Sequence, residues 1–374
     1  ALGFYERTVT AVLNGQLVPI LSRLIWDTRV MLKDRHIDAP VMIVKGDGTF
    51  ISAEAAKGRP IDTLLSGPAA SVTGAMFLSD SDNAVCADMG GTTTDIACLD
   101  HGKVKVSEEG ALVAGWRTRV RAIDIYTKGL GGDSIIELDD EGGIHIGPEK
   151  VTPLCLAAIE KKEFEGTKTG FTPTDLAHIK GIYSKWDKRP SEEWLRAQAE
   201  RLDMDYQALY DKLESAFLDS VYQALTESGQ YEEGDQVIGI GAPAMPWMPY
   251  VAERTGLDIR VPEHAEVANA IGAAVGNIEE STEITIRRDA VTGKYIGYLS
   301  WKRMEFDTLE EARKNCREEG MEWLKDQAWL CGCQIPDIIE ECEDIYCDRY
   351  QSTEKVYVET KIRLVAVGAP VFAE

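Results

Sequence analysis

Residues 84–107 contain the pattern that most limits how this chain can fold. An apolar segment ends at Asp88, and a short turn rich in glycine and threonine separates it from a second apolar segment, 96–100. Another turn leads into the strictly alternating KVKVSE (103–108). Short apolar runs joined by tight turns are typical of strands in hairpins. We therefore predict three consecutive antiparallel strands over 84–107, with Asp88 at one rim.

Strand and helix patterns alternate around this predicted hairpin. Apolar residues recur every three or four positions over 4–36, which predicts a long helix. Further helices are predicted within 66–78, 173–228, 244–256, 266–276 and 308–330, and further strands at 40–44, 236–241 and 257–262. This order indicates an α/β fold in which crossover helices cover a sheet with one hairpin pair. It is the pattern of an actin-like (ribonuclease-H-like) nucleotide-binding half.

The 374 residues are enough for two to three domains. We expect a helical and strand segment that packs on the core (1–80), the nucleotide-binding domain (81–280) and an α+β C-terminal domain (281–374). The last part contains strand-like segments and a charged amphipathic helix, unlike the small-residue helices before it.

Charge and composition exclude several classes of protein. The net charge of −23 argues against binding to nucleic acid or to anionic membranes. No run of eighteen apolar residues occurs and no secretory signal begins the chain, so we expect a cytoplasmic protein without a membrane span. The eight cysteines are predicted to be free thiols. The alternative, a zinc site made by Cys331, Cys333, Cys342 and Cys347, lacks a common zinc spacing.

Three glycine-rich turns are candidates for ligand binding. In the first, glycine N–H groups and threonine hydroxyls suit a phosphate, and Asp88 suits Mg²⁺; the alternative is a plain hairpin turn. The second is predicted to be a backbone cradle with a serine that caps a helix, and the third to approach a nucleotide base or ribose. Both of these could equally be turns without a ligand. The predicted binding residues are Gly90, Gly91, Thr92 and Thr93, then Gly131, Gly132 and Ser134, then Gly239, Gly241 and Ala242.

Seven segments together carry a resemblance to a known family. They are YERTVTAVLN (5–14), LLSGPAASVTGA (64–75), ADMGGTTTDIA (87–97), GLGGDSI (129–135), FTPTDLAHIKG (171–181), IGIGAPA (238–244) and VPEHAEVANAIGAAVG (261–276). In this order they resemble the hydantoinase A/oxoprolinase family of the actin-like ATPase superfamily. The resemblance covers roughly residues 5–276, and the C-terminal region fits by pattern alone.

The resemblance implies an ATP-dependent enzyme that opens cyclic amides through a phosphorylated intermediate. It also implies that Asp88 and Asp95 bind the Mg²⁺ that accompanies ATP, whereas no catalytic residue is assigned. Two alternatives stay open: an ATP-using subunit of an acetone- or acetophenone-type carboxylase, and a non-catalytic nucleotide-binding sensor. The substrate is accordingly a small amide or ketone. Because no GGT-type phosphate loop precedes residue 87, we expect the other wall of the cleft to come from a missing N-terminal half or from a partner subunit, in a homo- or hetero-oligomer.

Overall fold

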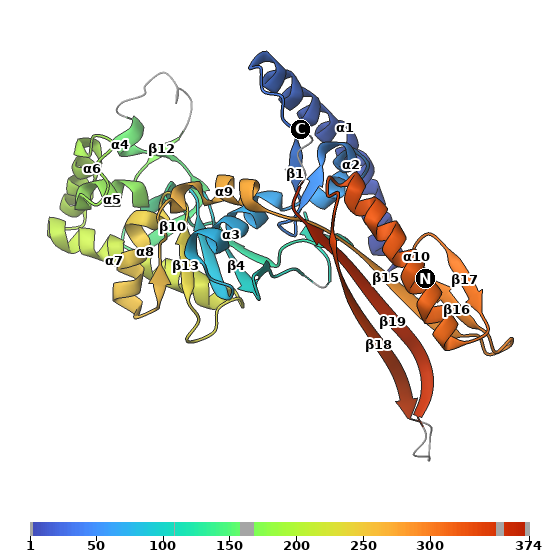
Figure 1. Cartoon of the computed structure of the whole chain (residues 1–374). Coiled ribbons are helices and arrows are strands. Elements are labelled where there is room, and N and C mark those ends of the chain that lie inside the picture. Colours follow the sequence, from blue (N-terminus) through green and yellow to red (C-terminus); the bar gives the residue numbers. More distant parts are fainter. Residues whose placement is uncertain (1–2, 108, 158–167, 349–354, 371–374) are drawn as a thin grey trace. The chain divides into compact units, whose positions relative to one another are not determined.

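The computed structural model describes residues 3–107, 109–157, 168–348 and 355–370, which form two compact units (Figure 1). Unit 1 comprises the described residues up to Val9, then Gly46–Gly48 and Leu64–Val275. Unit 2 comprises Thr10–Lys45, Thr49–Thr63 and the described residues from Gly276 onward. The three-domain division stays a prediction, and the contacts group the N-terminal residues differently. Helix α3 (Ser66–Ser79) lies in unit 1, whereas most of the chain before it lies in unit 2.

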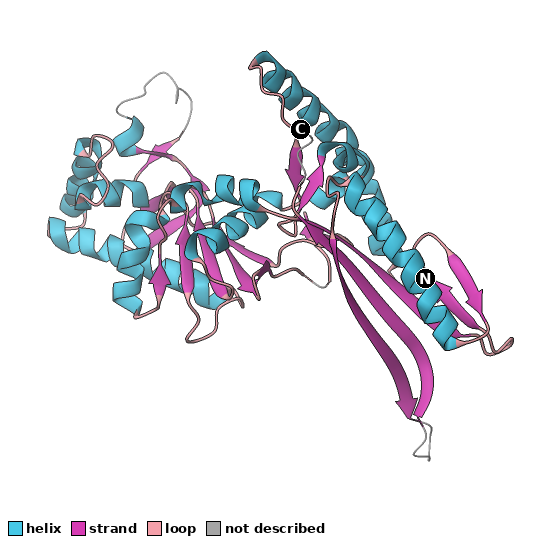
Figure 2. Cartoon of the chain, in the orientation of Figure 1, coloured by secondary structure: helices cyan, strands magenta, loops and turns pink. Residues whose placement is uncertain are grey.

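The central sheet of unit 1 has the strand order β14-β13-β3-β4-β5, and β8 also pairs with β4. Figure 2 shows strands in magenta among cyan helices in this unit. Its strands are β3 (Ala84–Met89), β4 (Thr94–Asp100), β5 (Lys103–Val104), β8 (Ile125–Lys128), β13 (Val237–Ile240) and β14 (Ile259–Arg260). The first three form the predicted antiparallel meander, and β13 runs parallel to β3. A meander followed by parallel strands on the side of its first strand is the actin-like, ribonuclease-H-like arrangement. The predicted fold class is confirmed.

Helices cover both faces of this sheet because its strands carry apolar side chains on both sides. Val85 and Met89 of β3 pack with the helices α5 to α8, whereas Cys86 packs on the opposite face with α3 and α9. A strand that is buried on both faces has a continuous apolar sequence. This explains the apolar runs AVCA (84–87) in β3 and VIGI (237–240) in β13. The helices are α4 (Leu154–Ala157), α5 (Pro173–Lys180), α6 (Arg189–Arg201), α7 (Tyr206–Glu227), α8 (Ala244–Thr255) and α9 (Ala268–Val275), with a short 3₁₀ turn at Ala265–Val267.

Smaller two-stranded elements complete unit 1. They are the antiparallel pairs β6 (Leu112–Val113) with β7 (Trp116–Arg117) and β9 (Ser134–Leu138) with β10 (Ile144–Lys150), and the parallel pair β11 (Thr152–Pro153) with β12 (Thr169–Gly170).

Unit 2 is an α+β arrangement in which helix α10 (Leu309–Leu330) packs on a mixed sheet. Its long central strand, β15, pairs with β16 and β19, and at Ile278 with Phe50 of β2. Segments from both ends of the sequence therefore build one sheet. Its elements are β1 (Met42–Val44), β2 (Phe50–Ser52), α2 (Ala53–Gly58), the 3₁₀ turn Pro60–Thr63, β15 (Ile278–Arg288), β16 (Tyr295–Tyr298), β17 (Arg303–Phe306), β18 (Asp337–Asp348) and β19 (Lys355–Gly368).

Helix α1 (Phe4–Asp34) confirms the long helix predicted from the sequence. Its most apolar window has a mean hydropathy of 1.3, so by length and composition it could cross a membrane. Polar residues such as Asn14 and Gln16 interrupt its apolar run, so the sequence expectation of no membrane-spanning helix did not anticipate this property. Core helices of other proteins and signal sequences share it, so it assigns no location.

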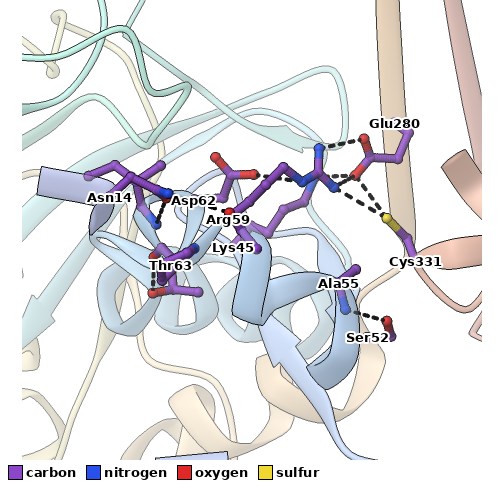
Figure 3. A network of polar contacts seen from close by, with 12 residues as sticks. Asn14, Lys45, Ser52, Ala55, Arg59, Asp62, Thr63, Glu280 and Cys331 are labelled. Atoms are coloured by element: carbon purple, nitrogen blue, oxygen red, sulfur yellow. Dashed lines mark hydrogen bonds and ion pairs between the residues drawn. The ribbon is translucent and has the colours of Figure 1, made fainter. Parts of the chain in front are cut away.

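An ionic network around one buried carboxylate inside unit 2 joins residues far apart in the sequence (Figure 3). The carboxylate of Glu280 on β15 is 7% exposed and accepts two hydrogen bonds from the Arg59 guanidinium, at 3.1 and 2.9 Å. The Lys45 ammonium lies 3.6 Å from the same carboxylate, and the Cys331 thiol donates to it at 3.3 Å. Burial raises the pKa of the Cys331 thiol to about 12, so it stays protonated as a donor. Because every member has a partner, the network ties the N-terminal segment to β15 and to the end of α10.

Glu280→Gln should lower the free energy of unfolding of unit 2 by about 3 kcal/mol at pH 7, because it leaves two cations without their buried counter-charge. Burial acts to raise the pKa of Glu280, but Arg59, Lys45 and Cys331 outweigh it and hold this pKa below its usual value. The charge of Glu280 therefore stabilises the fold above its unfolded-state pKa, and this contribution is lost as the pH falls through the folded-state pKa. Urea unfolding at pH 7 and below pH 4 measures the difference, which should shrink in acid.

Glu283→Gln removes an exposed carboxylate from the same strand and serves as the matched control. It should leave stability within about 0.5 kcal/mol of the parent. Equal effects of the two substitutions would show that the network contributes nothing specific.

Candidate functional site

Two carboxylates face each other at the end of the β3–β4 hairpin. Asp88 on β3 is directly opposite Asp95 on β4 in the antiparallel register, so both side chains lie on one face of the sheet. Burial raises the pKa of Asp88, and the Ser71 hydroxyl opposes this rise. Burial also raises the pKa of Asp95; the Thr127 hydroxyl, which donates to it at 2.6 Å, opposes the rise, and the charge of Asp88 adds to it. Two half-buried like charges side by side are costly without a cation between them.

The turn between these carboxylates presents hydrogen-bond donors. Gly90 N–H donates to the Thr93 carbonyl oxygen at 2.8 Å, which closes the turn. Within the described residues, the N–H groups of Gly91, Thr92 and Thr93 and the hydroxyls of both threonines donate to no protein acceptor. All three residues are half-buried. Successive N–H groups without protein acceptors on a partly buried turn form a concave site for an anion.

The second glycine-rich segment packs directly on this turn. Gly132 N–H donates to the Gly90 carbonyl oxygen at 3.0 Å, and Asp133 N–H donates to that of Gly91 at 2.7 Å. A Cβ atom on Gly131 would lie 2.5 Å from the Gly90 carbonyl oxygen, so only glycine permits this approach. From the opposite side, Thr94 Oγ1 donates to the Leu130 carbonyl oxygen at 2.6 Å.

These bonds differ from what the sequence predicted for the second segment. The predicted helix cap at Ser134 is wrong, because Ser134 begins the strand β9 and its hydroxyl accepts from Gly131 N–H at 2.8 Å. The N–H groups of Gly131 and Gly132 are used within the protein. The glycines here bring two loops together, and the role predicted for Gly131, Gly132 and Ser134 as ligand contacts stays a prediction.

The third turn lies at the same end of the sheet. β13 runs parallel to β3, so the carboxyl ends of both strands meet at one edge. Gly241 follows β13 with a φ of 92°, and a Cβ atom there would run into the Met89 carbonyl oxygen and lie 3.0 Å from Asp88 Oδ1. The structure thus brings the first and third predicted turns together around Asp88. Gly239 lies within β13, and Ala242 is exposed beside Gly241.

Sequence reasoning did not find Ser71 of α3, which interacts with Asp88, or Asn269 of α9, which contacts Ser71. The Asn269 amide donates to the Gly67 carbonyl oxygen at 2.8 Å and to the Ser71 hydroxyl at 3.1 Å. The sequence predicted both helices to be packing segments rich in small residues. Ser71 and Asn269 are isolated polar residues within them and form no repeating pattern.

Metal-binding alternatives outside this site find no support in the described part of the chain. All eight cysteines are free thiols, as predicted. Across the described residues, no three His, Cys, Asp or Glu side chains lie close enough together to hold a metal ion, so the four-cysteine zinc alternative fails. Any cation at Asp88 and Asp95 therefore needs further ligands from a bound molecule or water.

Comparison with known proteins agrees with this geometry. The family model described as hydantoinase/oxoprolinase matches residues 7–183, which include the hairpin, its turn and the second glycine-rich segment. This segment, slightly less than half of the chain, is similar to the hydantoinase/oxoprolinase family. The resemblance stated from the sequence is confirmed.

Individual relatives extend this likeness beyond the matched segment. Caprolactamase subunit alpha of Pseudomonas jessenii is 23% identical over 92% of this chain and 52% of its own length. The acetophenone carboxylase gamma subunit of Aromatoleum aromaticum is 26% identical over 47% of this chain and 24% of its own length.

Solved structures show the same fold. A nucleotide-free acetone carboxylase structure superposes with a TM-score of 0.67 at 17% identity, covering 98% of this chain and 58% of its own. The crystal structure of ATP-dependent caprolactamase from Pseudomonas jessenii gives 0.66 at 19% identity, covering 96% and 57%. The chain spans about half the length of these caprolactamase and acetone carboxylase chains, and less of the acetophenone carboxylase subunit.

Proposed function

We propose that this chain forms part of an ATP-dependent enzyme that opens a cyclic amide. The observation that carries the proposal is the turn at Gly91, Thr92 and Thr93. Its N–H groups have no protein acceptor within the described residues, and it connects the two strands that carry the facing carboxylates. The hydantoinase/oxoprolinase family and the likeness to an ATP-dependent caprolactamase support the reaction class.

The turn fits the phosphates of ATP. Backbone N–H groups at a glycine turn bind phosphate oxygens, and threonine hydroxyls add donors. Gly241, which closes over Asp88, leaves no room for a side chain there and suits the approach of the rest of the nucleotide. Gly90 to Thr93 would hold the phosphates, and the Gly239–Ala242 turn would lie nearer the base.

The facing carboxylates fit Mg²⁺. Magnesium is usually held by one or two carboxylates, with phosphate oxygens and waters completing its coordination. Asp88 and Asp95 supply the two carboxylates, and their mutual repulsion favours a bound cation. Magnesium would neutralise charge on the phosphates, and Ser71 and Thr127 would hold the carboxylates in place.

Phosphoryl transfer to a poorly reactive carbonyl oxygen is the chemistry that ATP would supply to a cyclic amide. A ketone is the second candidate substrate, because the chain also superposes on acetone carboxylase. The relatives named as subunits support a partner subunit for this chain as well. A reaction that consumes ATP favours the cytoplasm as its location.

ATP hydrolysis measured with a panel of lactams, hydantoins and ketones tests this proposal. In the protein that carries this chain, with any partner subunit present, a cyclic amide should raise phosphate release at least about tenfold, because substrate-dependent closure completes the site. The open-chain amide of the same carbon number is the matched control. Stimulation by ketones alone would move the assignment to the carboxylase class. ATP binding with no stimulation by any compound would favour the sensor alternative.

A further inference from the structure

A carboxylate that the proposed site does not use lies against its phosphate-binding turn. Asp133 N–H donates to the Gly91 carbonyl oxygen at 2.7 Å, which fixes the backbone of Asp133 beside the turn. The side chain of Asp133 also points toward the turn, because a Cβ atom on Gly91 would lie 2.5 Å from Asp133 Oδ2. The carboxylate therefore packs on Gly91, next to the N–H groups proposed to bind phosphate.

The charge of Asp133 is only weakly compensated. Lys150 Nζ lies 3.7 Å from Oδ2, but its side chain is 57% exposed, and an ion pair in that setting is largely screened by water. The Thr174 hydroxyl donates to the Gly132 carbonyl oxygen at 2.8 Å and lies a long 3.4 Å from Asp133 Oδ1. Asp133 is also not part of a three-residue metal cluster with Asp88 and Asp95, at least among the residues that the structure describes. It acts on the turn as a separate negative charge.

We propose that Asp133 makes this site selective for a nucleotide that carries a divalent cation, by repelling the free polyanion. This inference rests on the proposed function, since it takes the Gly90–Thr93 turn to hold the phosphates. ATP without a metal carries up to four negative charges, and a bound divalent cation removes two of them. Repulsion by a fixed carboxylate beside the turn therefore weakens binding of the free form most.

Asp133→Asn tests the proposal, because it removes the charge while preserving side-chain size. The backbone bond to Gly91 is unaffected, and the amide oxygen can take the place of Oδ1 beside Thr174. Affinity is measured by calorimetry for ATP in excess EDTA and for ATP in excess Mg²⁺. The wild type should bind free ATP at least tenfold more weakly than the magnesium complex. The variant should bind free ATP about tenfold more tightly than the wild type does, and the magnesium complex within about threefold. Raising the salt concentration should reduce the gain in affinity for free ATP that Asp133→Asn produces.

Asp140→Asn is the matched control, because it changes the net charge equally at a fully exposed position. It should alter neither affinity. Equal gains in affinity for free ATP and for the magnesium complex in Asp133→Asn, or no gain at all, would overturn the proposal. Wild-type protein that binds ATP in neither condition would instead refute the proposed nucleotide site, and this inference with it. The two failures are therefore distinguishable.

Discussion

Asp88→Asn should abolish ATP turnover while making the fold slightly more stable at neutral pH. The amide has the same size but no charge, so it cannot offset the charge of Mg²⁺ at the end of β3. We expect phosphate release in the protein that carries this chain to fall at least about 100-fold. Folding should benefit, because burial disfavours the ionised form of Asp88 and because Asp95 no longer faces a like charge.

This prediction is specific because Asp88→Asn should lower ATP turnover but raise the free energy of unfolding. Steady-state phosphate release reports turnover, and urea unfolding reports stability. Asp100→Asn, at the exposed end of β4, is the matched control and should change neither. A variant that hydrolysed ATP at the parental rate would remove Asp88 from the metal site. A variant that lost both activity and stability would show that the charge of Asp88 supports the fold.

Local patterns predicted the hairpin and one of its carboxylates well. Apolar segments, tight turns and strict alternation place β3, β4 and β5 within a few residues, because each strand is adjacent in sequence to its partner. The long helix α1 follows from periodicity in the same way. Nothing local, however, indicates that Gly131 and Gly132 would contact Gly90, which lies 41 and 42 residues earlier in the sequence. A glycine in the sequence indicates that another backbone segment could pack closely there, but it does not indicate which segment.

The wrong helix cap at Ser134 has a physical reason, and other features of the fold lie beyond what local patterns can predict. Glycines followed by a serine favour a helix cap, yet the residues after Ser134 include two isoleucines that pack in the core of unit 1 as part of the strand β9. The domain boundary expected at residue 80 stays a prediction, although α3 and β3 on either side of it pack together in one core. In unit 2, Phe50 pairs with Ile278 across more than two hundred residues. Composition and periodicity contain no information about such long-range pairing.

Gly272→Ala should strongly destabilise unit 1, although alanine is the better helix former. α3 and α9 lie side by side in close contact (Figure 1). A Cβ atom on Gly272 would overlap the Ala70 carbonyl oxygen, and one on Gly74 would overlap that of Ala268. Each glycine faces backbone atoms, which cannot rotate away as a side chain can. In an exposed helix this substitution stabilises by about 1 kcal/mol; here we expect a loss of about 3 kcal/mol or more, because the helices must separate.

Gly67→Ala, near the start of α3, separates this contact effect from helix propensity. No atom lies within 4 Å of the position its Cβ would take, so stability should stay the same or rise slightly. Hydrogen exchange of α3 and α9 amides, read together with the urea transition, reports unit 1 specifically. Nucleotide affinity should fall with Gly272→Ala as well, because Asn269 and Ala265 connect α9 to Ser71 and Gly241. A stabilised Gly272→Ala protein would show that the two helices are not in this close contact in solution.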